Sequence, residues 1–173
     1  MFKFFLLIAF ISISFIAPTT SYGQNTVLSG PIFRGSTVYG GPGGNYFSDQ
    51  PRGDCSLYAI KIRAGLYIDS IQAIYMTQSG EQPQVQHGGH GGIEHTFHLN
   101  PGEYIQRIDI RYGRFVDAIK FYTNFRQSSF YGGPGGSTLI SIPRPENCPN
   151  CRAIGFHGRS GTLLDAIGII WIE

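Results

Sequence analysis

The unit Gly-x-x-x-Asp occurs three times in the chain, at residues 65–69, 113–117 and 161–165, and successive copies start 48 residues apart. An ionised aspartate offers two acceptor oxygens. The glycine permits a backbone turn that other residues resist, and the residues after it can present backbone amides outward. We therefore expect each copy to hold a bidentate acceptor beside backbone donors, with the aspartate facing solvent at the end of the turn.

A glycine-rich loop also occurs three times, at residues 40–44, 88–92 and 132–136. Each copy has two glycines on either side of a central proline or histidine. Such a loop exposes further backbone N–H groups, because no side chain blocks approach to them. A turn and a loop together match the adjacent hydroxyls of a sugar, each of which donates and accepts. The alternative is that glycine and aspartate are present only because they form turns.

Repeats of this length indicate one supersecondary unit that is copied and packed against its siblings. Short runs of β-branched and aromatic residues alternate with Gly, Pro, Asn and Asp clusters, which indicates an all-β fold. Apolar residues at alternate positions after each aspartate lie on one face of a strand, and three such faces would share one core. The positions in register are Ile60, Ile108 and Phe156; Ile71, Ile119 and Ile167; Ala73, Phe121 and Ile169; and Tyr75, Thr123 and Trp171.

The N-terminus has the pattern of a secretory signal peptide, with a basic start at Lys3, an apolar run over residues 4–17 and small residues before Gln24. The alternative is a membrane anchor, but the run is short for a span of about 20 residues. We predict cleavage before Gln24 and secretion to the extracellular space. The chain then divides into a signal peptide (1–23), an N-terminal segment (24–35) and a single folded domain (36–173).

Charge and motifs exclude several functions. The formal net charge is +2, which falls to +1 when Lys3 is removed with the signal peptide. This is too small to attract nucleic acid or anionic lipid by its field alone. The sequence has no Gly-x-Ser-x-Gly elbow and no P-loop, and the repeated aspartates belong to separate copies instead of facing each other across a cleft. We expect no enzyme activity, no cofactor, no nucleic acid and no membrane insertion.

Three cysteines, Cys55, Cys148 and Cys151, predict at least one disulfide in a secreted chain, either Cys148–Cys151 or a link to Cys55, with the remaining thiol buried. Residues 145–151 are a loop insertion in the third repeat that the cysteines would hold, and residues 78–86 are expected to be a surface hairpin tip.

His87, His90, His95 and His98 cluster at the middle glycine loop. We expect a solvated, pH-sensitive loop there and no metal site, which needs about three convergent ligands.

Several stretches resemble the jacalin-related lectins. They are residues 39–44 (Tyr-Gly-Gly-Pro-Gly-Gly), 102–105 (Gly-Glu-Tyr-Ile), 119–124 (Ile-Lys-Phe-Tyr-Thr-Asn) and 155–165, the stretch that ends in the last Gly-x-x-x-Asp unit. They occur in the family's order and in threefold register, from about Ser36 to Glu173. The resemblance implies a β-prism I, with three four-stranded antiparallel sheets around a pseudo-threefold axis. It also implies that residues 36–173 form a jacalin-type lectin domain that binds carbohydrate without catalysis.

The resemblance further implies which residues would contact sugar, because the family combines each turn with a neighbouring glycine loop. One site would combine Gly161, Thr162, Leu163 and Asp165 with Gly44; a second Gly65, Leu66, Tyr67 and Asp69 with Gly92; and a third Gly113, Arg114, Phe115 and Asp117 with Gly136. We call these the Asp165, Asp69 and Asp117 sites. Three intact pairs are similar to the three-site mannose-binding members of the family.

The turns differ in their middle residue, which is Tyr67, Phe115 or Leu163. An aromatic ring can cover the apolar face of a sugar, so we expect the Asp69 and Asp117 sites to matter at least as much as the Asp165 site.

Galactose-binding members use a free amino terminus next to the glycine loop, whereas here about sixteen residues of uncut mature chain precede it. The resemblance therefore implies mannose- or glucose-type glycans. The alternative is a secreted structural or matrix protein that has lost sugar binding. The sequence also leaves a homodimer open.

Overall fold

The computed structural model describes residues 32–51 and 55–173, so the predicted signal peptide and its cleavage site lie outside the described residues. Within these ranges the chain forms strands and no helix, which confirms the all-β prediction. The strands are β1 (Phe33–Gly35), β2 (Tyr39–Gly40), β3 (Asn45–Ser48), β4 (Ser56–Ala64), β5 (Ile68–Thr77), β6 (Gly80–Pro83), β7 (His87–Gly88), β8 (Ile93–His98), β9 (Ile105–Tyr112), β10 (Val116–Thr123), β11 (Tyr131–Gly132), β12 (Thr138–Pro143), β13 (Arg152–Ser160) and β14 (Leu164–Ile172).

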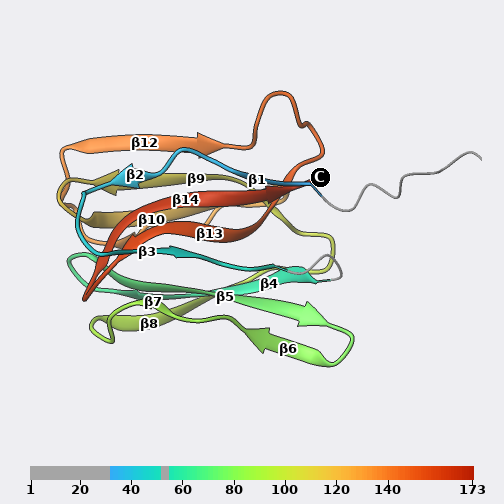
Figure 1. Cartoon of the computed structure of the whole chain (residues 1–173), viewed down its shortest axis with the longest axis horizontal. Coiled ribbons are helices and arrows are strands. Elements are labelled where there is room, and N and C mark those ends of the chain that lie inside the picture. The colour runs from blue at the N-terminus through green and yellow to red at the C-terminus, as the bar shows by residue number, and fades with distance from the viewer. Residues whose placement is uncertain (1–31, 52–54) are drawn as a thin grey trace, which may run out of the picture.

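These strands form three antiparallel sheets, one for each repeat (Figure 1). The first sheet has the order β6-β5-β4-β8, the second β11-β10-β9-β12 and the third β1-β14-β13-β3. The short strands β7 and β2 also pair with β5 and β14, on the edges that β6 and β1 occupy. Each sheet therefore has four strand positions, one of them interrupted in the first and third sheets. This arrangement confirms the predicted β-prism I.

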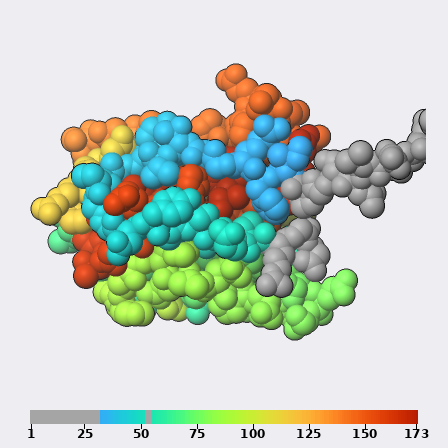
Figure 2. Space-filling model, in the orientation of Figure 1, coloured from blue at the N-terminus to red at the C-terminus, as the bar shows by residue number. Residues whose placement is uncertain are grey.

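The third sheet joins the two ends of the described chain. Strands β1, β2 and β3 come before residue 50, whereas β13 and β14 end the chain. Figure 2 shows the blue and teal N-terminal strands bordering the red C-terminal ones. This closure places the first glycine loop, residues 40–44, against the last Gly-x-x-x-Asp turn, as the prediction required: Gly40 pairs with Ala166 and Asn45 with Ser160.

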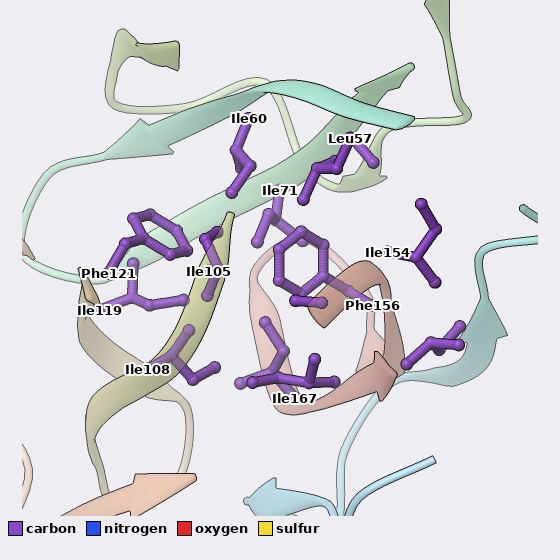
Figure 3. Packing of buried hydrophobic residues seen from close by; sticks show 14 of the residues in the cluster. Leu57, Ile60, Ile71, Ile105, Ile108, Ile119, Phe121, Ile154, Phe156 and Ile167 are labelled. Atoms are coloured by element: carbon purple, nitrogen blue, oxygen red, sulfur yellow. The ribbon is translucent and has the colours of Figure 1, made fainter. Parts of the chain in front are cut away.

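The core lies between the sheets and uses the residues that the repeat register predicted. All twelve predicted core positions are buried, and the largest fully buried side chains include Trp171, Phe121 and Phe156. Figure 3 shows side chains from all three sheets in one shared interior, among them Ile60, Ile119 and Ile167. Each buried side chain of this size contributes about 1.5–3 kcal/mol to stability. No single sheet could enclose this core, so the copies fold as one unit.

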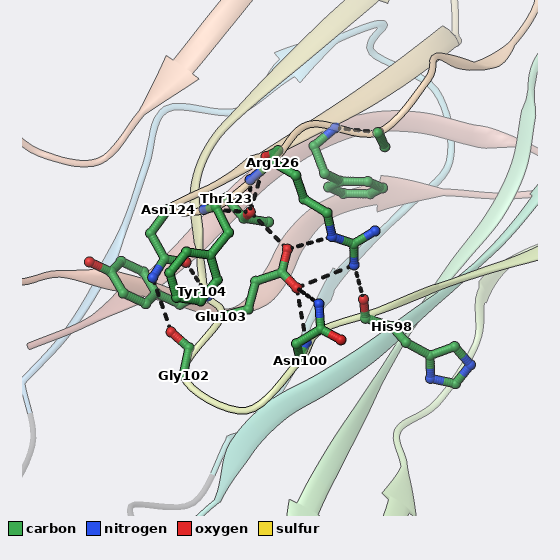
Figure 4. A network of polar contacts seen from close by, with 11 residues as sticks. His98, Asn100, Gly102, Glu103, Tyr104, Thr123, Asn124 and Arg126 are labelled. Atoms are coloured by element: carbon green, nitrogen blue, oxygen red, sulfur yellow. Dashed lines mark hydrogen bonds and ion pairs between the residues drawn. The ribbon is translucent and has the colours of Figure 1, made fainter.

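A buried carboxylate joins the first and second sheets at the end opposite the Gly-x-x-x-Asp turns. Glu103 accepts hydrogen bonds from Arg126 Nε (2.8 Å), Thr123 Oγ1 (2.8 Å) and the Asn100 backbone N–H (2.9 Å), as Figure 4 shows. Arg126 also donates to the carbonyl oxygen of His98 in β8. Burial alone would raise the pKa of Glu103, but these hydrogen bonds and the guanidinium charge hold that pKa below its usual value.

The cysteine and hairpin predictions are also borne out. Cys148 and Cys151 form a disulfide in the loop between β12 and β13, and Cys55 is buried outside that bond. The segment after Thr77 turns back as the β5–β6 hairpin. Over residues 32–51 and 55–173, the structure contains no helix of the length and apolarity that a bilayer span requires.

Candidate functional site

Each repeated aspartate is the extra residue of a β-bulge. In the first sheet Arg63 pairs with Ser70 and Ala64 with Ile68, so Asp69 has no opposite residue. The ladders skip Asp117 in β10 and Asp165 in β14 in the same way. A bulge leaves one residue unpaired and bends the strand, which redirects its side chain. The three carboxylates are therefore aimed by the same local irregularity.

The carboxylates point at the glycine loops, and each turn lies against the loop with which the family resemblance paired it. A β-carbon on Gly44 would lie 2.4 Å from Asp165 Oδ2, one on Gly92 would lie 2.5 Å from Asp69 Oδ2, and one on Gly136 would lie 2.7 Å from Asp117 Oδ2. These separations are below any normal contact, so only glycine lets the loop backbone approach the carboxylate. The same three glycines have φ of 68°, 60° and 77°, a region that side chains resist.

The turns themselves are tight and their tips are exposed. The amide of Gly65 donates to the carbonyl of Tyr67 at 2.9 Å, and the other two turns close in the same way. The residue before each aspartate is fully buried and fixes the turn to the core: Ile68, Val116 and Leu164. The two residues after each glycine lie outside the ladders, and their amides have no backbone partner in the described part of the chain. They remain available as donors.

A third repeated residue, which our reading of the sequence missed, stabilises the loops. Arg159 donates to the carbonyl oxygens of Gly43 (2.8 Å) and Gly44 (2.6 Å). Arg63 makes the equivalent bonds to Gly91 (2.8 Å) and Gly92 (3.0 Å), whereas Arg111 makes one longer bond, 3.3 Å, to Pro134. We call Arg63, Arg111 and Arg159 the loop arginines. Each lies two residues before a turn glycine, so the 48-residue register of the repeat could have revealed them.

The three sites touch one another in a ring at one end of the prism, the left end in Figure 1, where β14 begins. The second glycine of each loop packs on the backbone of a turn from another site. Gly41 lies against Arg114, Gly89 against Thr162 and Gly133 against Leu66, each so closely that a β-carbon would overlap the backbone. Each site therefore borders the turn of a neighbouring site.

The aspartates are more buried than the sequence led us to expect, because the glycine loops lie over them. Asp117 and Asp165 are each only 4% exposed, and Asp69 is half-buried. Burial raises the pKa of Asp165, and the Gly161 amide, Arg159 and Arg114 oppose that rise. Burial likewise raises the pKa of Asp117 against the Gly113 amide and Arg111. The prediction that these carboxylates face solvent was wrong for both.

The aromatic turn residues contact each other as well as the solvent. The rings of Tyr67 and Phe115 meet edge to face, with centroids 5.6 Å apart. Tyr67 is 39% exposed, whereas Phe115 is half-buried. Leu163, the middle residue of the last turn, is also half-buried. The aromatic pair thus lies at the junction of the Asp69 and Asp117 sites.

The histidines do not form a common cluster. His87 Nε2 lies 2.8 Å from Asp49 Oδ1, and its ring stacks on Phe47, so it joins the first and third sheets. His90, His95 and His98 are exposed: His90 lies in the glycine loop within 3.2 Å of Gln86, and the ring of His95 contacts Tyr131. The described residues contain no group of three or more side chains placed to hold a metal ion. The prediction of a solvated loop was therefore wrong for His87.

The fold and the threefold set of turn, loop and aspartate define a β-prism protein with one repeated candidate site for each sheet. The model of the jacalin-like lectin domain matches residues 36–170, and the chain belongs to this family. Griffithsin from Griffithsia sp. is 35% identical over 135 residues, which cover 77% of this chain and 93% of griffithsin. Zymogen granule membrane protein 16 from Homo sapiens is 30% identical over 138 residues, 79% of this chain and 78% of that protein.

Solved structures agree with this assignment. AcmJRL, described as a mannose binding jacalin related lectin from Ananas comosus, has a TM-score of 0.69 and 30% identity, and covers 83% of this chain and 98% of its own. A structure of the artocarpin–mannotriose complex gives a TM-score of 0.69 at 28% identity, with the same coverage.

Proposed function

We propose that this protein is a secreted lectin that binds mannose- or glucose-type glycans, without catalysis, through three sites centred on Asp69, Asp117 and Asp165. The observation that carries the proposal is that a carboxylate, a glycine loop and a turn with unpaired amides come together three times in equivalent geometry. A carboxylate accepts from two sugar hydroxyls, while the amides donate to others. Family membership supports carbohydrate binding as the general activity.

The relatives support the choice of sugar. AcmJRL from Ananas comosus is described as mannose binding, and the artocarpin structure is a complex with mannotriose. A relative from Parkia platycephala is named as a mannose/glucose-specific lectin. Each site has few contacts, so we expect a weak single-site affinity, with a dissociation constant of about 1 mM, equivalent to about 4 kcal/mol. Engagement of several sites by a branched glycan would add roughly 10²–10⁴ in avidity.

Two proteins are compared in the test: the mature chain and a triple variant with Asn in place of Asp69, Asp117 and Asp165. Each is titrated with mannose by calorimetry and screened on a glycan array. Asn keeps the size of the side chain but replaces one acceptor oxygen with a donor. We expect binding to disappear, because a weak site has little free energy to lose. The matched control is Asp109→Asn, a buried aspartate bound to Arg107 and Ser141 on the second sheet.

We expect the control variant to bind sugar as the wild type does. A folded triple variant that still binds mannose unchanged would exclude these sites. A wild-type protein that binds no glycan on the array would favour the other candidate, a secreted structural or matrix protein with a jacalin-like fold. Sequencing the N-terminus of secreted material would test the signal peptide.

A further inference from the structure

The three sites have the same backbone arrangement but differ in one side chain. It belongs to the residue of the neighbouring turn that packs on the second glycine of the loop. Beside the Asp69 site this residue is Thr162, beside the Asp117 site it is Leu66, and beside the Asp165 site it is Arg114. All three residues are exposed. Only one of the three sites therefore has a cation at this position.

Arg114 is held near the Asp165 site by its own backbone. Its carbonyl and α-carbon pack on Gly41, and the loop that starts there continues through Gly43 and Gly44, which cover the Asp165 carboxylate. The guanidinium lies over the ring of Phe115, at 5.5 Å from the centroid. Its charge reaches Asp165, since it is one of the groups that oppose the rise in the pKa of that carboxylate. The cation and the candidate site are thus electrostatic neighbours.

Within the part of the chain that the structure describes, the guanidinium of Arg114 is not bonded to any anionic group. Among residues 32–51 and 55–173 it makes no hydrogen bond and no ion pair, whereas the three loop arginines all bind loop carbonyls. An arginine offers five N–H donors in a planar fork that suits carboxylate, sulfate or phosphate oxygens. Stacking on Phe115 limits the freedom that it would lose on binding.

We propose that Arg114 forms an anion subsite beside the Asp165 site, so that this site prefers a glycan in which a sugar next to the bound one carries a negatively charged group such as sulfate or carboxylate. The proposal rests on the function proposed above. The Asp69 and Asp117 sites, with Thr162 and Leu66 at the equivalent position, bind neutral glycans. One molecule would therefore present two neutral sites and one that recognises charge.

The test uses the mature chain and compares neutral mannan, chemically sulfated mannan and mannan oxidised to carry carboxylates. Arg114→Leu gives the Asp165 site the same side chain that Leu66 places beside the Asp117 site. We expect it to lower the affinity for sulfated mannan about tenfold, which corresponds to one charge-assisted hydrogen bond. The ratio of the affinity for sulfated mannan to that for neutral mannan should fall by the same factor, since the substitution keeps the backbone amide that Arg114 offers to the Asp117 site and removes only the charged group. The carboxylated arm shows whether the subsite distinguishes carboxylate from sulfate, and inorganic sulfate alone measures the charge contribution without sugar.

Two further variants separate a subsite from general charge. Arg34→Leu removes the same charge from β1, where Arg34 is exposed and pairs with Trp171 near the far end of β14. Leu66→Arg places an arginine beside the Asp117 site and should raise the affinity for sulfated mannan. Three outcomes would overturn the proposal. Arg34→Leu could lower the affinity for sulfated mannan as much as Arg114→Leu does, Arg114→Leu could leave that affinity unchanged, or Arg114→Leu could lower the affinity for neutral mannan by the same factor. Failure of the wild type to bind neutral mannan would contradict the proposed function instead.

Discussion

At the scale of the residue, Asp117 and Asp165 carry a cost in stability because the loops bury them. Burial makes the pKa of each carboxyl higher in the folded chain than in the unfolded one. Protonation therefore favours folding: the favourable contribution is present below the unfolded-state pKa and is lost as pH rises through the folded-state pKa. Two aspartates buried at this cost are consistent with a role in binding.

We predict that Asp117→Asn and Asp165→Asn melt at the same temperature as the wild type or higher at pH 7, while sugar binding at the altered site is lost. The difference in melting temperature between variant and wild type should shrink as pH falls toward the ordinary carboxyl pKa of about 4, because the wild-type carboxylates become neutral there. Scanning calorimetry from pH 7 to pH 4 measures it. A melting temperature several degrees lower for both variants at pH 7 would show that the ionised carboxylates stabilise the fold.

At the scale of the element, the last glycine of each loop brings the loop backbone to the carboxylate. The chain contains a matched pair for separating backbone strain from steric overlap. Gly136 and Gly102 both have φ of 77°. A β-carbon on Gly102 meets nothing within 4 Å, whereas one on Gly136 would lie 2.7 Å from Asp117 Oδ2 and 2.8 Å from the backbone of Tyr112.

We predict that Gly102→Ala costs about 1–2 kcal/mol, the cost of a left-handed conformation, and leaves sugar binding intact. Gly136→Ala should cost more, because the loop must also move away from Asp117, and it should abolish binding at the Asp117 site. Urea denaturation and mannose titration of the two variants measure both effects. Equal losses of stability would mean that the overlap is relieved at no cost.

The loop arginines give a second comparison at this scale, because their bonding is unequal. Arg159 makes two short bonds to its loop and Arg111 one long bond. We predict that Arg159→Met weakens binding at the Asp165 site by about tenfold, since a hydrogen bond to a charged group contributes about 1.5–3 kcal/mol. Arg111→Met should change binding at the Asp117 site far less. Titrations on backgrounds with Asn at the other two aspartates measure each site alone.

At the scale of the whole molecule, the three sites lie in contact at one end of the prism, because each loop packs on the turn of a neighbouring site. One branched glycan or one glycan-bearing surface could therefore engage several sites together. We predict that avidity for a branched mannose glycan falls in steps as the three aspartates are replaced one after another, while the affinity for free mannose at each remaining site stays constant. Surface plasmon resonance on an immobilised branched glycan measures the steps. A complete loss on Asp165→Asn alone would show that only the closing site is active.

The repeats made much of this predictable. The 48-residue register placed the core positions, since apolar residues at alternate positions lie on one face of a strand whatever surrounds it. Resemblance to the family supplied the pairing of each turn with its loop, which no local pattern contains. The loop arginines were missed even though they follow the same register, because a long charged side chain on a strand is usually a solvated residue.

The sequence by itself determined the strands, the threefold core and the identity of the turn and loop residues, because these depend on short-range periodicity and on backbone conformations that glycine permits. Only the tertiary structure decided the environment of the side chains. Burial of Asp117 and Asp165, the pairing of His87 with Asp49 and the position of Arg114 beside another repeat's site all arise from contacts between sheets. Such contacts join residues that are distant in the chain, and their effect on charge depends on a distance and a degree of exposure that composition and spacing do not specify.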